Sequence, residues 1–456
     1  MGVNGLCGLI GYNPSLQKQY ILHDCTVVID GYFQLYAKAN VHCVVVLDGG
    51  YDPSNGKLRT IQKRNMDRVY QMKRLQGADA EKIKALPSHA TVVYRSILAQ
   101  LNVEVIQCVF EADEYIASHA NKLNCPVISD DSDFFVYDLK GGLIQLSSLD
   151  RKTVQKQLKP GGPIITGAAV PDWIVSGFVA GRIPSKIITV VATGINFLYI
   201  KIEALHMRSS YEVSLPLRKC LYGFVFKGQT NMIQELDRSG HGLRFQDVEF
   251  LEGEVGLLEI PDLSAKQRLT IFNNCVLPTA NCADLVDLAE GKLLLYALEY
   301  LVLNTSVNWQ FALSLLVTHV VTQATAARTE DEHVSYLLGV HVYSHEVRGF
   351  SNFFRKPTPG QRLDVQLIHK TNEYTGCFDA IYWLNGLLGA FKTNFKFHLV
   401  LNGVFLHNFY KDLNGRPQPA RYLADHWQPN SRLHRMFDNL WNQILQRLFS
   451  EMKRNT

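Results

Sequence analysis

Cys25-Thr-Val-Val-Ile-Asp30 is the stretch that decides the fold, because it is a short β-branched run that ends in a carboxylate. His42–Asp48, Val103–Asp113 and Cys125–Asp133 repeat the same pattern further along the chain. Short apolar runs of this kind, separated by segments with helical periodicity, indicate buried parallel strands. Residues 1 to about 150 are therefore predicted to form an α/β domain, with a parallel sheet flanked by helices.

The acids that follow these runs predict a site at one edge of the sheet. Ligands of open α/β sheets bind at the carboxyl ends of the strands. Several carboxylates gathered there would repel one another unless a cation lay among them. Mg²⁺ and Mn²⁺ prefer oxygen ligands, so the pattern indicates one or two such ions. The candidate metal ligands are Asp30, Asp48, Glu111, Asp113, Asp131 and Asp133.

A simpler interpretation treats each of these acids separately, as a helix cap or a first-turn acid that is favourable beside a helix dipole. Capping alone does not require an acid at the end of every strand, and the metal-site interpretation is therefore the leading one. Two metal ions held by shared carboxylates activate a water molecule and stabilise the leaving oxygen of a phosphodiester.

Residues 57–75 form a cationic segment with Asp67 as the only acid. If this segment is helical, Lys57, Arg64 and Arg68 fall on one face, where they can meet a phosphate. A solvated surface helix is the alternative.

The composition narrows the class of protein. The 456 residues suffice for two or three domains, and the net charge of +4 permits nucleic-acid binding without requiring it. There is no phosphate-binding P-loop motif and no secretory signal, and we expect an intracellular protein. Residues 300–327 lack charge but are interrupted by polar residues, so they predict two core helices and no membrane span. The chain after residue 171 is predicted to be mainly helical.

The ordered motifs resemble the flap-endonuclease/XPG-type nucleases. They are Met1–Leu6, Val27–Asp30, Val46–Gly49, Glu111–Asp113 and Ser129–Asp133. Within that superfamily Val28–Tyr32, Val46–Gly50 and Asn124–Phe134 are most similar to the asteroid family.

The resemblance implies a PIN-like nuclease domain over residues 1–215 and a helical, asteroid-type region over residues 216–456. It places the six acids on metal-ligand positions and makes Asp131, Lys57 and Arg64 catalytic. Nucleic acid, DNA more than RNA, is the implied partner, and a nuclear location follows from it. Protein partners are implied for the helical region, and no membrane is. The residues that we expect to contact nucleic acid are Gly2, Lys57, Lys63, Arg64 and Arg68.

Three features depart from the family pattern. Only residues 31–47 separate the first two aspartates, where the family has a longer segment with a helix and a wedge that meets bent DNA. Asn196 stands where the family has a further acid, and the glycine hairpin that grips duplex DNA is missing from the sequence. These departures leave open a second function, that of a catalytically weakened or inactive scaffold that binds nucleic acid or protein partners, with growth-factor signalling implied by the resemblance alone.

Overall fold

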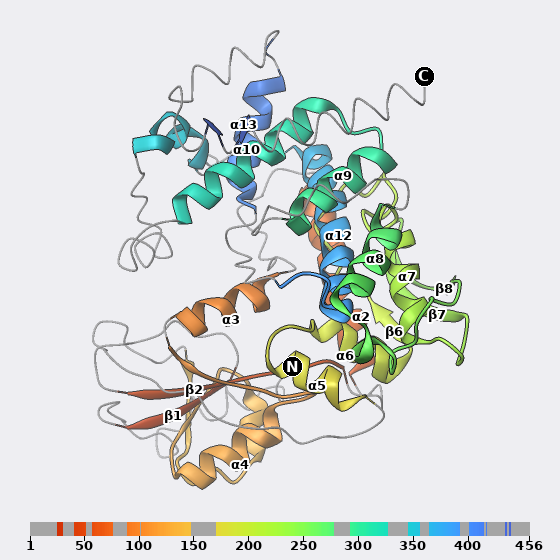
Figure 1. Cartoon of the computed structure of the whole chain (residues 1–456). Coiled ribbons are helices and arrows are strands. Elements are labelled where there is room, and N and C mark those ends of the chain that lie inside the picture. Colours follow the sequence, from red (N-terminus) through yellow and green to blue (C-terminus); the bar gives the residue numbers. More distant parts are fainter. Residues whose placement is uncertain are drawn as a thin grey trace. The chain divides into compact units, whose positions relative to one another are not determined.

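The chain forms two compact units, one of residues 1–64 with 89–196 and one of residues 65–88 with 197–456 (Figure 1). Gly2 and residues 31–40 lie outside the described part, and the domain boundary expected after residue 215 stays a prediction. The computed structural model describes residues 25–30, 41–51, 57–75, 89–100, 102–146, 170–277, 292–326, 345–355, 364–392, 401–414, 416, 434–435 and 437–438.

The first unit is built on a five-stranded sheet with the order β3-β2-β1-β4-β5. Every pairing in it is parallel, which confirms the predicted parallel sheet. The strands are β1 (Thr26–Asp30), β2 (His42–Leu47), β3 (Glu104–Gln107), β4 (Val127–Ile128) and β5 (Leu143–Ile144).

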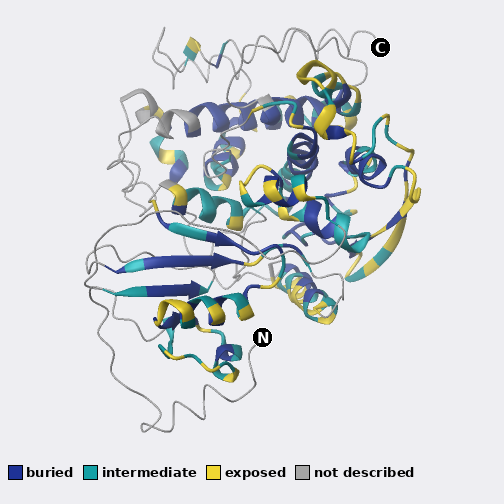
Figure 2. Cartoon of the chain, turned by 60° about the horizontal axis from the view of Figure 1, so that its bottom comes forward, coloured by how far each residue is buried: buried dark blue, intermediate teal, exposed yellow. Residues whose placement is uncertain are grey.

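Both faces of this sheet are covered, which explains why its strands are continuously apolar. Val28 and Val46 pack with residues of α4 (Asp113–Leu123). Val27 and Val45 point the other way and pack with Leu98 of α3 (Ala90–Gln100). Figure 2 shows the strands mainly as buried. Complete burial of a valine side chain contributes about 1.5–3 kcal/mol.

The same alternation decides where the acids at the strand ends lie. Asp30 follows Val28 by two residues, and Asp48 follows Val46 by two. Because side chains two apart share a face of a strand, both carboxylates are directed to the face that α4 covers. Asp30 pairs with Val46 in the register of the two strands, so the two acids lie close together at the carboxyl end.

The remaining elements of the first unit follow the sheet. η3 (Ser132–Val136) is a short 3₁₀-helix after β4, and α5 (Asp172–Val179) and α6 (Ser185–Thr193) precede β6 (Ile195–Phe197). The cationic segment forms α2 (Leu58–Leu75), as predicted, and its residues are divided between the two units.

The second unit is mainly helical, as expected. α12 packs against α9, α7 and α8, and α13 packs against α10 and η7. The two core helices predicted for residues 300–327 and their flanks are confirmed as α9 and α10. Across the described ranges, no helix is both long enough and apolar enough to cross a membrane. The elements are α7 (Leu215–Val225), η5 (Ile260–Asp262), α8 (Ala265–Val276), α9 (Lys292–Asn304), α10 (Trp309–Ala326), η7 (His345–Phe354), α12 (Val365–Leu388) and α13 (Gly403–Asn414).

A β-hairpin interrupts this helical region. β7 (Met232–Ser239) and β8 (Gly242–Glu249) are antiparallel and joined by a tight turn in which Gly240 has a φ of +57°. Such a positive φ favours glycine. The sequence pattern does not predict these two strands.

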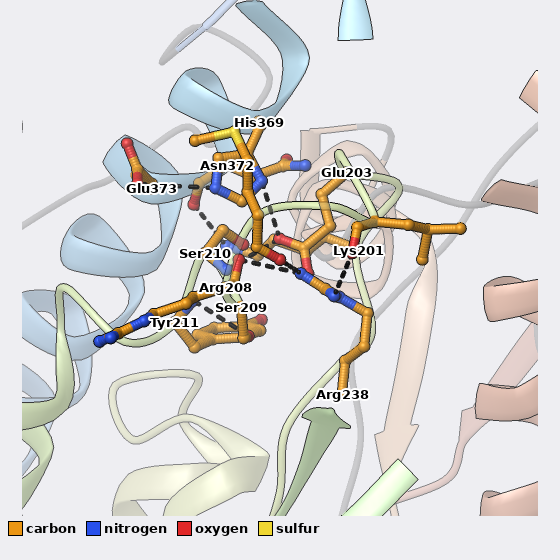
Figure 3. A network of polar contacts seen from close by, with 12 residues as sticks. Lys201, Glu203, Arg208, Ser209, Ser210, Tyr211, Arg238, His369, Asn372 and Glu373 are labelled. Atoms are coloured by element: carbon orange, nitrogen blue, oxygen red, sulfur yellow. Dashed lines mark hydrogen bonds and ion pairs between the residues drawn. The ribbon is translucent and has the colours of Figure 1, made fainter. Parts of the chain in front are cut away.

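A buried polar network stabilises the turn end of the hairpin (Figure 3). Arg238 Nε donates to Glu203 Oε1 at 2.5 Å, and the Ser210 amide donates to Glu203 Oε2 at 2.8 Å. His369 of α12 lies between Glu203 and Glu373, at 3.5 and 3.6 Å. Each buried charge thus has a partner, which the low polarity of the interior requires.

Candidate metal and phosphate site

Asp30 is held at the end of β1 by a residue of the neighbouring strand region. The Ser129 hydroxyl donates to Asp30 Oδ2 at 2.7 Å. The same hydroxyl oxygen accepts a hydrogen bond from the Asp131 amide at 2.9 Å. Since Ser129 is buried, this chain of bonds fixes the start of the acidic loop relative to β1.

Asp131 and Asp133 lie where β4 leads into η3. Asp131 Oδ1 accepts the Asp133 amide at 3.1 Å and caps η3. The capping role that the sequence left open is therefore observed for one oxygen of Asp131. Capping and participation in an acidic cluster are compatible, because a carboxylate has several acceptor positions.

Asp48 lies one residue beyond β2. Its Oδ1 accepts the Ala112 amide at 2.9 Å, which links the end of β2 to the start of α4. Gly49 follows directly, and its amide donates to the Phe110 carbonyl at 2.8 Å. A Cβ at this glycine would overlap the Val109 carbonyl oxygen, so the close approach of the two chains requires Gly49.

Lys57 brings a positive charge to the acids. Its ammonium forms an ion pair with Glu111, although the two residues are far apart in sequence. Burial lowers the pKa of Lys57, but the hydrogen bond and charge of Glu111, helped by Asp48 and Asp113, outweigh this effect and raise the pKa overall.

The carboxylates disfavour one another's ionisation. Burial raises the pKa of Asp30 to about 6, against the hydrogen bond from Ser129, and the charges of Asp48, Asp113 and Asp131 add to the increase. Loss of hydration and the charge of Glu111 raise the pKa of Asp48, while Lys57 and Arg64 oppose the change.

Asp113 behaves in the same way. Burial raises its pKa first, and then the charges of Asp48, Asp131 and Asp133 do so. The six predicted acids thus come from four separate segments of the chain and influence one another electrostatically.

The donor atoms of this site suit a divalent cation, but their positions do not form a complete metal site. All the donors are carboxylate oxygens, and a hard cation among them would remove their repulsion. Among the described residues, however, no group of three or more His, Cys, Asp or Glu side chains is positioned to hold a metal ion as it stands.

The other predicted phosphate-facing residues have different surroundings. Arg64 is exposed and close enough to lower the pKa of Asp48, and Lys63 is exposed on the same helix. The guanidinium of Arg68 lies 3.8 Å from the centroid of the Tyr199 ring and donates to Asn65 Oδ1 at 2.8 Å. Binding of nucleic acid by Arg64, Lys63 and Arg68 stays a prediction.

Two residues near the site were not singled out from the sequence. Ser129 belongs to the motif that ends in Asp133, but its bond to Asp30 joins residues that are distant in sequence. Gln107 is a polar residue inside the apolar run of β3, and that interruption was the available signal. Asn196 is fully buried in β6, and its correspondence to a further acid of the family stays a prediction.

Two family models match the chain, the first described as Asteroid N-terminal domain over residues 290–456 and the second as XPG domain containing over residues 70–174. The chain therefore resembles the asteroid family and the XPG-type nucleases in the two parts that these models match. Protein asteroid of Drosophila melanogaster is 32% identical over 191 residues, which is 35% of this chain and 22% of that protein.

The chain is also similar to proteins named single-strand DNA endonuclease ASTE1. The human protein is 36% identical over 26% of this chain and 18% of its own length. The Danio rerio protein is 33% identical over 28% of this chain and 19% of its own length. The chain therefore spans about a fifth of the length of these relatives. No solved structure matches it significantly. The parallel sheet, the XPG-domain match and these relatives together support a nuclease-like protein.

Proposed function

We propose that this protein is a metal-dependent nuclease that hydrolyses nucleic-acid phosphodiesters. The observation that carries the proposal is the cluster of mutually destabilised carboxylates at the carboxyl end of the sheet, with Lys57 beside it. Relatives named single-strand DNA endonuclease favour DNA as the substrate, and a DNA substrate implies a nuclear location.

In this proposal Asp30, Asp48 and Asp131 hold one Mg²⁺ or Mn²⁺, and Glu111, Asp113 and Asp133 complete the site for that ion or a second one. The bound metal would supply a nucleophilic water and stabilise the leaving oxygen. Ser129 holds the Asp30 carboxylate, and the Ala112 amide holds that of Asp48. Both acids are therefore oriented before substrate arrives.

Lys57 and Arg64 are proposed to contact the phosphate. In the absence of substrate, Glu111 neutralises the Lys57 ammonium. A phosphate oxygen would compete with Glu111 for this ammonium, and charge-assisted hydrogen bonds of this kind are strong. Lys57 would then stabilise the charge that develops on the scissile phosphate.

The test is cleavage of end-labelled single-stranded and flap DNA in Mn²⁺, with wild type compared with Asp131→Ala. Asp138→Asn is the control, because Asp138 is exposed in the same unit. Circular dichroism establishes that all three proteins are folded. The proposal requires cleavage by wild type and Asp138→Asn and none by Asp131→Ala. A folded wild type that does not cleave in Mn²⁺ or Mg²⁺ refutes it.

A second candidate is a scaffold that binds nucleic acid or a protein partner without cutting. Among the described residues, no group of three or more His, Cys, Asp or Glu side chains is positioned to hold a metal ion. The resemblance also implies that Asn196 stands in place of a further acid. This candidate predicts that the protein shifts single-stranded DNA in a gel in EDTA and leaves it intact when Mn²⁺ is restored. Partners of the helical region would then carry the function.

A further inference from the structure

Gln107 makes an unusual set of contacts for a side chain that is only 6% exposed. Its Nε2 lies 3.1 Å from the Leu47 carbonyl oxygen, 2.9 Å from that of Asp48 and 3.1 Å from that of Cys108. Its Oε1 accepts from Arg95 Nη1 at 3.3 Å. Since carbonyls surround one end of the amide and a guanidinium the other, only one orientation of the amide satisfies its surroundings.

Backbone carbonyls of α5 hold the Arg95 guanidinium in place. The guanidinium donates to the Phe178 carbonyl at 3.3 Å and to the Val179 carbonyl, both at the end of α5. A cation is favourable at the carboxyl end of a helix, where the carbonyls have no partner within the helix. A methyl group on Gly181 would lie 3.3 Å from Arg95 Cζ, so the chain closes around the guanidinium.

These contacts bear on Asp48 at the point where the sheet ends. The ladder between β2 and β3 pairs residues only as far as Leu47 and Gln107. Beyond it, the Asp48 carbonyl accepts from the Gln107 amide, and the next residue, Gly49, donates to the Phe110 carbonyl. The main chain of Asp48 is thus fixed on the side of β3, where Ala112 meets its carboxylate.

We propose that Gln107, oriented by Arg95, is the positioning residue that fixes the Asp48 carboxylate against the Ala112 amide. This inference rests on the proposed function, because that function makes Asp48 a metal ligand. The contact between the Gln107 amide and the Asp48 carbonyl itself needs neither metal nor substrate. Gln107 touches no reacting group and acts only through the main chain of Asp48. Removal of its amide would free that main chain and let the carboxylate leave the position it needs beside Glu111.

The experiment measures hydrogen exchange of the Ala112 amide, resolved to single residues, in metal-free protein. Gln107→Leu should speed this exchange at least tenfold, because the Asp48 carboxylate would no longer be held where it accepts the hydrogen bond of the Ala112 amide. The Ile116 amide, which donates to the Ala112 carbonyl inside α4, serves as the internal reference and should keep its wild-type rate. Thr193→Val is the matched control, since it removes a side-chain hydrogen bond of 2.7 Å elsewhere in the same unit.

Gln107→Glu is a second variant of the same shape, for the case that Gln107→Leu does not fold. It keeps an acceptor for Arg95 but puts an oxygen against three carbonyl oxygens, so it should also speed exchange at Ala112. A third variant, Asp48→Asn/Gln107→Leu, should bind Mn²⁺ no more weakly than Asp48→Asn alone, as measured by electron paramagnetic resonance.

The outcomes separate this inference from the proposed function. Faster exchange at Ala112 in the Gln107 variants, with no change at Ile116 or in Thr193→Val, supports the positioning role even if the protein cuts no DNA. Exchange at Ala112 that equals that of Thr193→Val overturns it, even if the protein is an active nuclease. A further loss of Mn²⁺ affinity in the double variant also overturns it, because Gln107 would then act independently of Asp48.

Discussion

Replacement of Asp30 by Asn is expected to stabilise the metal-free protein at neutral pH. Burial raises the pKa of this carboxyl to about 6 from an ordinary value of 3.8. A pKa that is raised by folding means that the folded state holds the proton more tightly than the unfolded state does. The stability associated with this proton is fully present below pH 3.8 and is lost as the pH rises through 6.

The size of the effect follows from the same values. A difference of about 2 pKa units corresponds to about 3 kcal/mol, which the ionised carboxylate costs the folded state at pH 7.5. Most of that cost is absent at pH 4, where the folded state is almost fully protonated and the unfolded state is only partly ionised. Asn is never ionised, and its side-chain oxygen can still accept the hydrogen bond from the Ser129 hydroxyl. Asp30→Asn should therefore add about 2–3 kcal/mol to the free energy of unfolding at pH 7.5 and well under 1 kcal/mol at pH 4.

The assay is urea denaturation in EDTA at several values between pH 4 and pH 7.5. Asp138→Asn, at an exposed position, serves as the control and should change the free energy of unfolding by less than about 0.5 kcal/mol. A gain for Asp30→Asn that does not grow with pH would refute the reasoning, and so would a loss at pH 7.5.

We predict three further outcomes, which concern Lys57, the buried pair of Arg218 with Glu235, and the thiols of Cys220 and Cys275. Lys57→Met should slow Mn²⁺-dependent cleavage about 100-fold in a gel assay, because it removes a preorganised cation. Glu235→Leu should cost about 3–5 kcal/mol in urea denaturation, since it leaves Arg218 buried without the carboxylate to which it is now bonded at 2.6 and 2.8 Å. Cys220 should react with iodoacetamide before Cys275, because the hydrogen bond between the thiols lowers the pKa of Cys220 and raises that of Cys275.

Each of these has its own control. Arg59→Met removes an exposed cation from the first turn of α2, two residues after Lys57, and should leave cleavage unchanged; equal losses in both variants would contradict a specific role for Lys57. Arg218→Met combined with Glu235→Leu should recover most of the stability lost in Glu235→Leu alone. Cys275→Ala, which removes the hydrogen-bond donor, should slow alkylation of Cys220, and an unchanged rate would show that the thiol contact is not responsible.

The sheet could be predicted from the sequence because strands that are buried on both faces are continuously apolar. β1 and β2 are unbroken β-branched runs, and their flanking helices have clear apolar periodicity. The edge at which the acids lie follows from the rule for parallel strands, without knowledge of any contact.

The hairpin of β7 and β8 was missed because most of the buried side chains of β7 are charged. Glu235, Asp237 and Arg238 are all buried within β7, so the strand lacks the apolar alternation that identifies a half-buried strand. Their partners, such as Glu203 for Arg238 and Arg218 for Glu235, lie elsewhere in the chain. Local pattern cannot reveal pairings of this kind.

The acids of the candidate site could be predicted from the sequence, but the contacts that hold them in place could not. Each acid follows a strand and was found from that fact. The ion pair of Lys57 with Glu111 and the bonds of Gln107 to Asp48 join residues more than fifty positions apart. Such contacts depend on how neighbouring strands are arranged, which no single motif encodes.

The central place of β1 in the sheet has a consequence for synthesis of the chain. β2 follows β1 closely and pairs with one of its edges, but the other edge pairs with β4, which lies about a hundred residues later. At about 5–20 residues per second, a ribosome needs about 5–20 s to make the intervening chain. During that time the unpaired backbone N–H and C=O groups along that edge of β1 are open to pairing with other chains. A transcript or ribosome that stops before β4 would therefore release a product with both an unprotected strand and an incomplete acidic cluster.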